Sequence, residues 1–247
     1  MPLVYLSPSM QTENQYLGGG DEQHYMNQIV DNMEPYLRTN GIQFVRCKPG
    51  TLPGQAIRES NAGYYDLHLT LRSNASPENL TGRLMGADVF YFTYGARGKR
   101  AAEIIVENYK RIYSDPVLVK AVPTNRMVEV TKTNAPAAVV ETAYHDNISD
   151  VEWLKGHIDA IAVNLVESLT RYFGIPFIGK PMLPLRGTVD TEGRGLNLHT
   201  KPDGNSPVIT QAPNGAPVAI LGLWQNWYVL DYQDNIGYAD SKYVILA

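Results

Sequence analysis

Short apolar runs alternate with longer segments of helical periodicity through roughly the first 175 residues. The apolar runs are rich in β-branched and aromatic residues, and they fall at residues 4–6, 42–46, 65–71, 88–94 and 137–140. Helical spacing of apolar positions fills residues 21–41, 56–62, 98–113 and 150–172. Asp21 is a suitable N-cap for the first of these helices, and Gly41 is a suitable C-terminal stop. The alternation predicts an α/β domain whose mixed sheet is covered by helices on both faces.

The pattern changes after residue 173. Three prolines and few charges occupy residues 174–184, and from residue 185 onward short β-type runs are separated by turn sequences at 201–204 and 213–215. We therefore predict a first domain at residues 1–178, a linker at 179–184 and a small all-β barrel at 185–247. Because the linker has few apolar anchors, we expect the two domains to fold independently.

Composition excludes several classes of partner. The chain of 247 residues carries 21 basic and 25 acidic residues, a net charge of -4, and no stripe of Lys and Arg that would hold a phosphate backbone. No apolar run approaches membrane-spanning length, and the N-terminus lacks the features of a signal peptide. We therefore expect no nucleic-acid partner and no membrane insertion. Action outside the cell would need another export route.

A single cysteine limits the covalent and metal chemistry. Cys47 has no second cysteine with which to form an internal disulfide or a thiolate metal site. We expect a packing role for it.

Four segments carry candidate chemistry. They are Leu-Ser-Pro-Ser-Met-Gln at residues 6–11, Glu22, Leu-Thr-Leu-Arg-Ser-Asn-Ala at 69–75 and Val-Val-Glu-Thr-Ala-Tyr-His-Asp-Asn at 139–147. Their order and spacing resemble the zinc-dependent N-acetylmuramoyl-L-alanine amidases, over roughly residues 1–175. The resemblance implies a peptidoglycan hydrolase that cleaves the amide between the muramic acid lactyl group and L-alanine. It also implies an extracellular or cell-wall location, as for endolysins and autolysins.

In that family two histidines and a glutamate hold zinc, and a second glutamate activates the metal-bound water. Hydrolytic zinc keeps an open position beside three protein ligands, so that the bound water can lose a proton near neutral pH. The resemblance places Glu22 at the glutamate ligand and Glu141 at the catalytic glutamate, which would act as general base and then proton donor. The histidine positions fall on Met10 or Gln11 and on Arg72.

Arg72 cannot replace a histidine ligand, because a guanidinium has no lone pair to donate and carries a positive charge. With Asn74 it is a candidate substrate-binding residue. His68 lies four residues earlier on the same predicted strand, ~13 Å away at ~3.3 Å per residue, and His24 points away from Glu22 on the predicted helix. His145 could reach the site from the loop after the last strand, as a candidate metal ligand, or it could belong to a capping turn.

Because the histidine ligands of the family are not matched, two hypotheses remain. One is a zinc amidase, and the other is a metal-free protein that binds the cell wall on the same fold. In the second case Arg72 would supply the positive charge of the missing cation, and we expect its guanidinium to bridge Glu22 with Glu141 or with Gln11.

The C-terminal segments resemble bacterial SH3 domains over residues 185–247. The matching stretches begin at Gly187, Gly195, Pro207, Gly215, Asn226 and Gly237. The resemblance implies recognition of cell-wall peptide. We expect Trp224, Tyr228 and Tyr238 to form the wall-binding surface and Trp227 to pack in the barrel core.

Overall fold

The computed structural model describes residues 1–48 and 50–247. Contacts between Cα atoms divide the chain into two compact units. The larger unit comprises Leu3–Met33 and Phe44–Tyr172, and the smaller comprises Met1–Pro2, Glu34–Gln43 and Phe173–Ala247. None of the helices in these residues has both the length and the apolar character needed to cross a bilayer.

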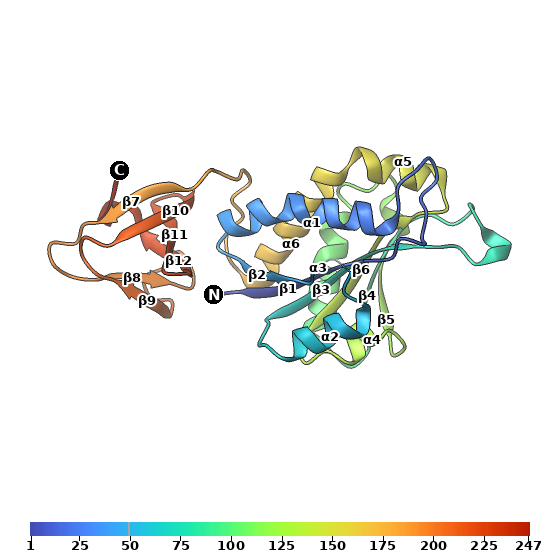
Figure 1. Ribbon diagram of the computed structural model, residues 1–247, viewed down its shortest axis with the longest axis horizontal. Coiled ribbons are helices and arrows are strands. Elements are labelled where there is room, and N and C mark those ends of the chain that lie inside the picture. The colour runs from blue at the N-terminus through green and yellow to red at the C-terminus, as the bar shows by residue number, and fades with distance from the viewer. Residues whose placement is uncertain (49) are drawn as a thin grey trace. The chain divides into compact units, whose positions relative to one another are not determined.

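A six-stranded sheet forms the centre of the larger unit (Figure 1). Its strand order is β2-β1-β3-β6-β4-β5. The strands are β1 (Leu3–Pro8), β2 (Gln43–Arg46), β3 (Leu67–Asn74), β4 (Ala87–Phe92), β5 (Val119–Thr124) and β6 (Ala137–Tyr144). β3 pairs in parallel with β1 and β6, whereas β4 is antiparallel to β6 and parallel to β5. The sheet is mixed, as predicted, and the C-terminal ends of β3 and β6 lie at the same edge as the start of β4.

Helices cover both faces of this sheet. They are α1 (Glu22–Thr39), α2 (Pro53–Asn61), α3 (Ala96–Tyr109), α4 (Val128–Thr131), α5 (Ile148–Gly156) and α6 (Ile158–Phe173), with short 3-10 turns η1 (Glu78–Leu80) and η2 (Pro116–Leu118). Figure 1 shows α1, α5 and α6 along one face and α2 and α4 on the other. Buried hydrogen bonds from Asn108 of α3 to Ser168, and from Asn164 to Asn108, join α3 to α6. The predicted fold class is therefore confirmed.

Several elements differ from those predicted. β5 and α4 were not expected, because neither segment has a clear period, and the expected helix at 150–172 is two helices that meet at His157. Its backbone leaves helical geometry, with φ -127° and ψ 16°. β3 and β6 extend beyond the expected ends at residues 71 and 140, to Asn74 and Tyr144. These extensions place Arg72 and Glu141 on strands, where their direction is fixed by the pleat.

The C-terminal strands form the expected small barrel. They are β7 (Leu185–Val189), β8 (Leu196–His199), β9 (Val208–Ala212), β10 (Pro217–Trp224), β11 (Trp227–Tyr232), β12 (Asn235–Asp240) and β13 (Val244–Leu246), with the 3-10 turn η3 (Ser241–Tyr243). Their order is β13-β7-β10-β11-β12-β8-β9, and neighbours are antiparallel. Inward residues of these strands, among them Leu198, Ile220 and Leu230, are buried in one apolar core.

Candidate functional site

Four charged side chains form a row across the sheet where β3 and β6 end. Arg72 on β3 is the register partner of Glu141 on β6, Glu141 is the partner of Asp88 on β4, and Asp88 is the partner of Lys120 on β5. Register partners on neighbouring strands project from the same face of a sheet. We call these four residues the charged row. The antiparallel β4 is what brings Asp88 beside the end of β6.

Glu141 is the most perturbed carboxyl group in this row. It is 8% exposed, and its pKa is raised to about 8 by burial first, and then by the negative charges of Asp88 and Glu22, against the opposing charge of Arg72. Burial also raises the pKa of Asp88, which the charge of Lys120 partly offsets. A carboxyl group with a pKa near 8 holds its proton through much of the neutral range and can exchange it there.

Arg72 forms its ion pair with Glu129 of α4. Glu129 is 4% exposed and had not been identified from the sequence, because the four-residue α4 has no helical period to reveal it. Burial lowers the pKa of Arg72, while the negative charges of Glu22 and Glu141 act to raise it. The expected bridge from Arg72 to Glu22 is therefore wrong. The guanidinium balances nearby carboxylates by its charge, but its contact is with Glu129.

Glu22 is held by other partners. It opens α1, is 1% exposed, and accepts hydrogen bonds from the Asn14 side chain and, at 3.2 Å, from the backbone N–H of Ser73. The same amide nitrogen of Asn14 donates to Oε1 of Gln11 at 2.6 Å. Asn14 thus joins Glu22, which the resemblance places at a metal-ligand position, to Gln11, one of the two candidates for another. Met10, the other candidate, is partly buried against the apolar cluster of Tyr5, Cys47 and Ala56. The polar loop at residues 9–20 gave no sequence signal for this role.

His145 lies on the Glu22 side of β3. Its Nδ1 is 2.9 Å from Oγ of Ser73, and its ring lies 5.8 Å from that of Tyr16. Its backbone N–H donates to the carbonyl oxygen of Asn74 at 2.9 Å. The Asn74 side chain lies 3.5 Å from a carboxylate oxygen of Asp88. His145 and Asn74 therefore both belong to the polar edge of the sheet, next to the residues expected there.

These residues do not fit a zinc ion. Arg72 offers no lone pair, both carboxylate oxygens of Glu22 accept hydrogen bonds, and Nδ1 of His145 faces Ser73. Within residues 1–48 and 50–247, no three His, Cys, Asp or Glu side chains are grouped so that they could share a metal ion. The donor set is that of a hydrogen-bonded polar cluster and not that of a hydrolytic zinc site.

His68 and His24 lie apart from Glu22, as predicted from the sequence. His68 is completely buried, with Nδ1 2.9 Å from Oγ of Ser60, and burial lowers its pKa to about 4. His24 is exposed on α1. Neither side chain joins Glu22.

A small cavity of about 110 Å³ opens beside the Arg72–Glu129 pair. Ser9 and Gln11 line it together with Thr70. Thr70 is 2% exposed, and its hydroxyl finds no hydrogen-bond partner in the described part of the chain. The cavity therefore presents a guanidinium and several hydroxyl and amide groups to a polar ligand.

The barrel aromatics divide between core and surface. Tyr238 is fully buried, and its hydroxyl donates to the carbonyl oxygen of Asn40 at 2.9 Å. Tyr238 has no surface to offer a ligand, which corrects the expectation for this residue. Trp224 is half-buried, and Tyr228 is half-buried against the barrel core. Trp227, expected in the core, is also half-buried and lines a surface pocket.

Comparison with known proteins finds likenesses for both parts of the chain. The bacterial SH3 domain family matches residues 194–245. No curated protein sequence matches the chain. Three solved structures illustrate the likeness of the α/β part. The amidase AmiC2 of Nostoc punctiforme is 18% identical at a TM-score of 0.61, over 70% of this chain and 97% of that one.

The other two are catalytic domains. That of the amidase CwlV from Bacillus (Paenibacillus) polymyxa var. colistinus is 13% identical at a TM-score of 0.61, over 70% of this chain and 99% of its own. That of the CD27L endolysin, which targets Clostridia difficile, is 18% identical at a TM-score of 0.56, over 68% of this chain and 96% of its own. The protein thus combines a domain of the N-acetylmuramoyl-L-alanine amidase fold with a C-terminal bacterial SH3 domain.

Proposed function

We propose that this protein binds peptidoglycan at the bacterial cell wall and does so without zinc-dependent amidase chemistry. The α/β domain would hold a wall fragment along the edge formed by the charged row and the Arg72 cavity, and the SH3 domain would add a second contact with the wall. Two of the fold neighbours are named as N-acetylmuramoyl-L-alanine amidases and one as an endolysin domain, and they support peptidoglycan as the partner and an extracellular or wall-associated place of action.

The observation that carries this proposal is the Arg72–Glu129 ion pair at a position where the resemblance requires a metal-binding histidine. A zinc ion there would meet a guanidinium that carries the same sign of charge. It would also have to displace Asn14 and Ser73 from Glu22. The charge repulsion and the loss of these hydrogen bonds both disfavour metal binding. Without a metal, the polar edge of the sheet suits the amide and hydroxyl groups of a wall fragment.

A second candidate is hydrolysis of the wall, and Glu141 favours it. Its carboxyl group is 8% exposed, and its pKa is raised to about 8, so it could transfer a proton at neutral pH. The resemblance assigns Glu141 the catalytic position. In this candidate the protein would cleave the bond between the muramic acid lactyl group and L-alanine.

The experiment that separates the candidates uses the full chain and purified bacterial sacculi. Cosedimentation measures binding, dye release from labelled sacculi measures hydrolysis, and elemental analysis measures metal after dialysis with and without added zinc. Binding without dye release and without stoichiometric zinc is the expected result. Glu141→Gln is the matched control, because it removes a titrating group and keeps the shape. Dye release that this substitution abolishes would establish the hydrolase, and a chain that stays in the supernatant would contradict the proposed function.

A further inference from the structure

The Arg72 cavity, the space of about 110 Å³ beside the Arg72–Glu129 pair, limits its occupant by size. Its lining includes Ser7 of β1 and Thr70 of β3, which are register partners and are both buried. The loop after β1 and the segment that leads into α2 complete its walls. At ~30 Å³ per water molecule, the cavity has the volume of about four waters. Its occupant is therefore a group of a few heavy atoms that ends inside the cavity.

The Thr70 hydroxyl favours a polar occupant. The side chain is 2% exposed, and among the residues that the structure describes no atom forms a hydrogen bond with this hydroxyl. A buried polar group without a partner destabilises a folded chain. A ligand atom that shares a hydrogen bond with Thr70 removes this penalty, which adds to the affinity for that ligand.

Arg72 and Gln11 add hydrogen-bond donors to the same cavity. The Arg72 guanidinium has five N–H groups, and the hydrogen bond to Glu129 leaves others for a ligand. Oε1 of Gln11 accepts from Asn14 at 2.6 Å, so the amide nitrogen of Gln11 is the part of this side chain left to donate. The occupant must therefore present an acceptor oxygen.

The charges around the cavity favour a neutral occupant. Glu13 and Glu129 line it with Arg72, and the negative charges of Glu22 and Glu141 also act on Arg72. A carboxylate would meet this excess of negative charge, and an ammonium would meet the guanidinium. A neutral group with an acceptor oxygen avoids both repulsions.

Apolar atoms form the rest of the lining. Met10 is partly buried against the cluster of Tyr5, Cys47 and Ala56, and its side chain lines the cavity together with that of Pro53. Apolar surface beside hydrogen-bond donors is typical of a site that orients a small, partly apolar ligand group. An acetamido group has this composition, because it joins a carbonyl oxygen to a methyl group.

We propose that the Arg72 cavity binds the acetamido group of an N-acetylated amino sugar in the wall glycan. The acetamido oxygen accepts hydrogen bonds from the Thr70 hydroxyl and the Arg72 guanidinium, and the methyl group contacts Met10. A backbone amide of a peptide continues through carbon on both sides and cannot end in so small a cavity, so the glycan supplies the occupant. This inference rests on the proposed function and names the part of the wall that the α/β domain recognises.

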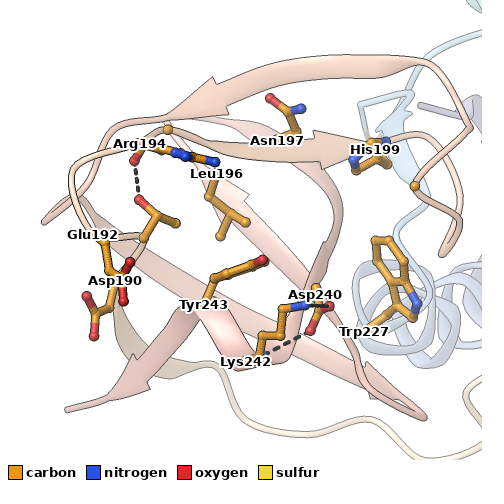
Figure 2. Close-up of a pocket in the computed structure, with 13 residues that line it drawn as sticks. Asp190, Glu192, Arg194, Leu196, Asn197, His199, Trp227, Asp240, Lys242 and Tyr243 are labelled. Atoms are coloured by element: carbon orange, nitrogen blue, oxygen red, sulfur yellow. Dashed lines mark hydrogen bonds and ion pairs between the residues drawn. The ribbon is translucent and has the colours of Figure 1, made fainter.

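The SH3 domain has a pocket of a different kind. Its volume is about 890 Å³, and Figure 2 shows the charged residues Asp190, Glu192 and Arg194 at one end of it. Within the described residues, the linings of this pocket and of the Arg72 cavity have no residue in common. A substitution in the SH3 pocket therefore serves as a control for the cavity.

The test is isothermal titration of the full chain with tetra-N-acetylchitotetraose, a glycan in which every sugar carries an acetamido group. Cellotetraose has a hydroxyl group at each of these positions and should bind at least tenfold more weakly. The N-butanoyl analogue of the first glycan should bind at least fivefold more weakly, because its longer acyl chain exceeds the cavity. Thr70→Val keeps the shape of the side chain and removes one donor, so it should weaken binding of the acetylated glycan at least threefold. Thr70→Ser should restore most of the affinity.

Controls separate a lost contact from a lost fold. Thr93→Val removes an exposed hydroxyl outside the cavity, and Asp190→Asn changes the SH3 pocket, and both should leave the titration unchanged. In urea unfolding, Thr70→Val should be at least as stable as the wild type, because it removes a buried hydroxyl that has no partner. Weaker binding by this variant then reports the contact with the ligand.

Two results would overturn the proposal. One is equal binding of the acetylated glycan and cellotetraose, and the other is wild-type affinity of Thr70→Val for the acetylated glycan. Cosedimentation with sacculi keeps the two ideas apart. A chain that sediments with sacculi but does not prefer the acetylated glycan would refute the cavity assignment and leave the proposed function standing, whereas a chain that stays in the supernatant would contradict the proposed function.

Discussion

Replacing Arg72 by Met tests the electrostatic account of the candidate site. The Arg72 side chain is 20% exposed and that of its partner Glu129 is 6% exposed. Removing one member of a buried ion pair costs ~3–5 kcal/mol, because the other charge is left uncompensated. The partial exposure of Arg72 favours the lower end, about 3 kcal/mol, which corresponds to a fall in melting temperature of roughly 6–12 °C for a chain of this size.

The two partners should not be equivalent. Glu129→Gln leaves the Arg72 guanidinium near the negative charges of Glu22 and Glu141, whereas Arg72→Met leaves three carboxyl groups without a cation. We therefore expect Glu129→Gln to cost less than Arg72→Met. The double variant Arg72→Met with Glu129→Met should be more stable than Arg72→Met, because an apolar pair can replace a buried ion pair and only Glu22 and Glu141 then lack the cation.

The assay is urea unfolding followed by circular dichroism at several pH values. The charge of Arg72 lowers the pKa of Glu141, so this pKa rises above about 8 when Arg72 is removed, and a raised pKa in the folded state means that stability is lost as pH increases. The deficit of Arg72→Met should therefore be largest above pH 8 and should shrink as the pH falls. Equal costs for the two single variants, or an Arg72→Met deficit under 1 kcal/mol at every pH, would refute the reasoning.

Three further predictions concern the site and the domains. Because the pKa of Glu141 is raised from 4.5 to about 8, wild-type stability should fall as pH rises between these values, by at most about 5 kcal/mol, and Glu141→Gln should flatten this fall in urea unfolding. Arg72→His combined with Gln11→His should raise zinc affinity at least tenfold in a competition assay with a fluorescent chelator, and unchanged affinity would contradict the ligand mapping. Residues 1–178 and 185–247, expressed separately, should each unfold cooperatively by calorimetry, and a failure of both pieces would show the boundary to be misplaced.

Local patterns were sufficient for much of the fold. The apolar period of α1, its N-cap Asp21 and its stop at Gly41 all appear in the structure, where the Asp21 carboxylate accepts from the His24 N–H and Gly41 has φ 70°. These features depend on neighbours within a few residues, so the sequence contains them directly. β5 and α4 were missed because their form depends on packing against β4 and β6, and their own residues have no clear period.

The candidate site shows the same division. The sequence by itself determined that Arg72 cannot act as a histidine-type ligand, because this follows from the chemistry of its side chain. The roles of Glu22 and Glu141 come from the family resemblance and stay predictions. Only the tertiary structure decided that Arg72 pairs with Glu129, that Asn14 joins Gln11 to Glu22, and that Tyr238 is buried. Each of these contacts depends on register, strand length or burial, which are set by the whole fold and not by the residues around each position.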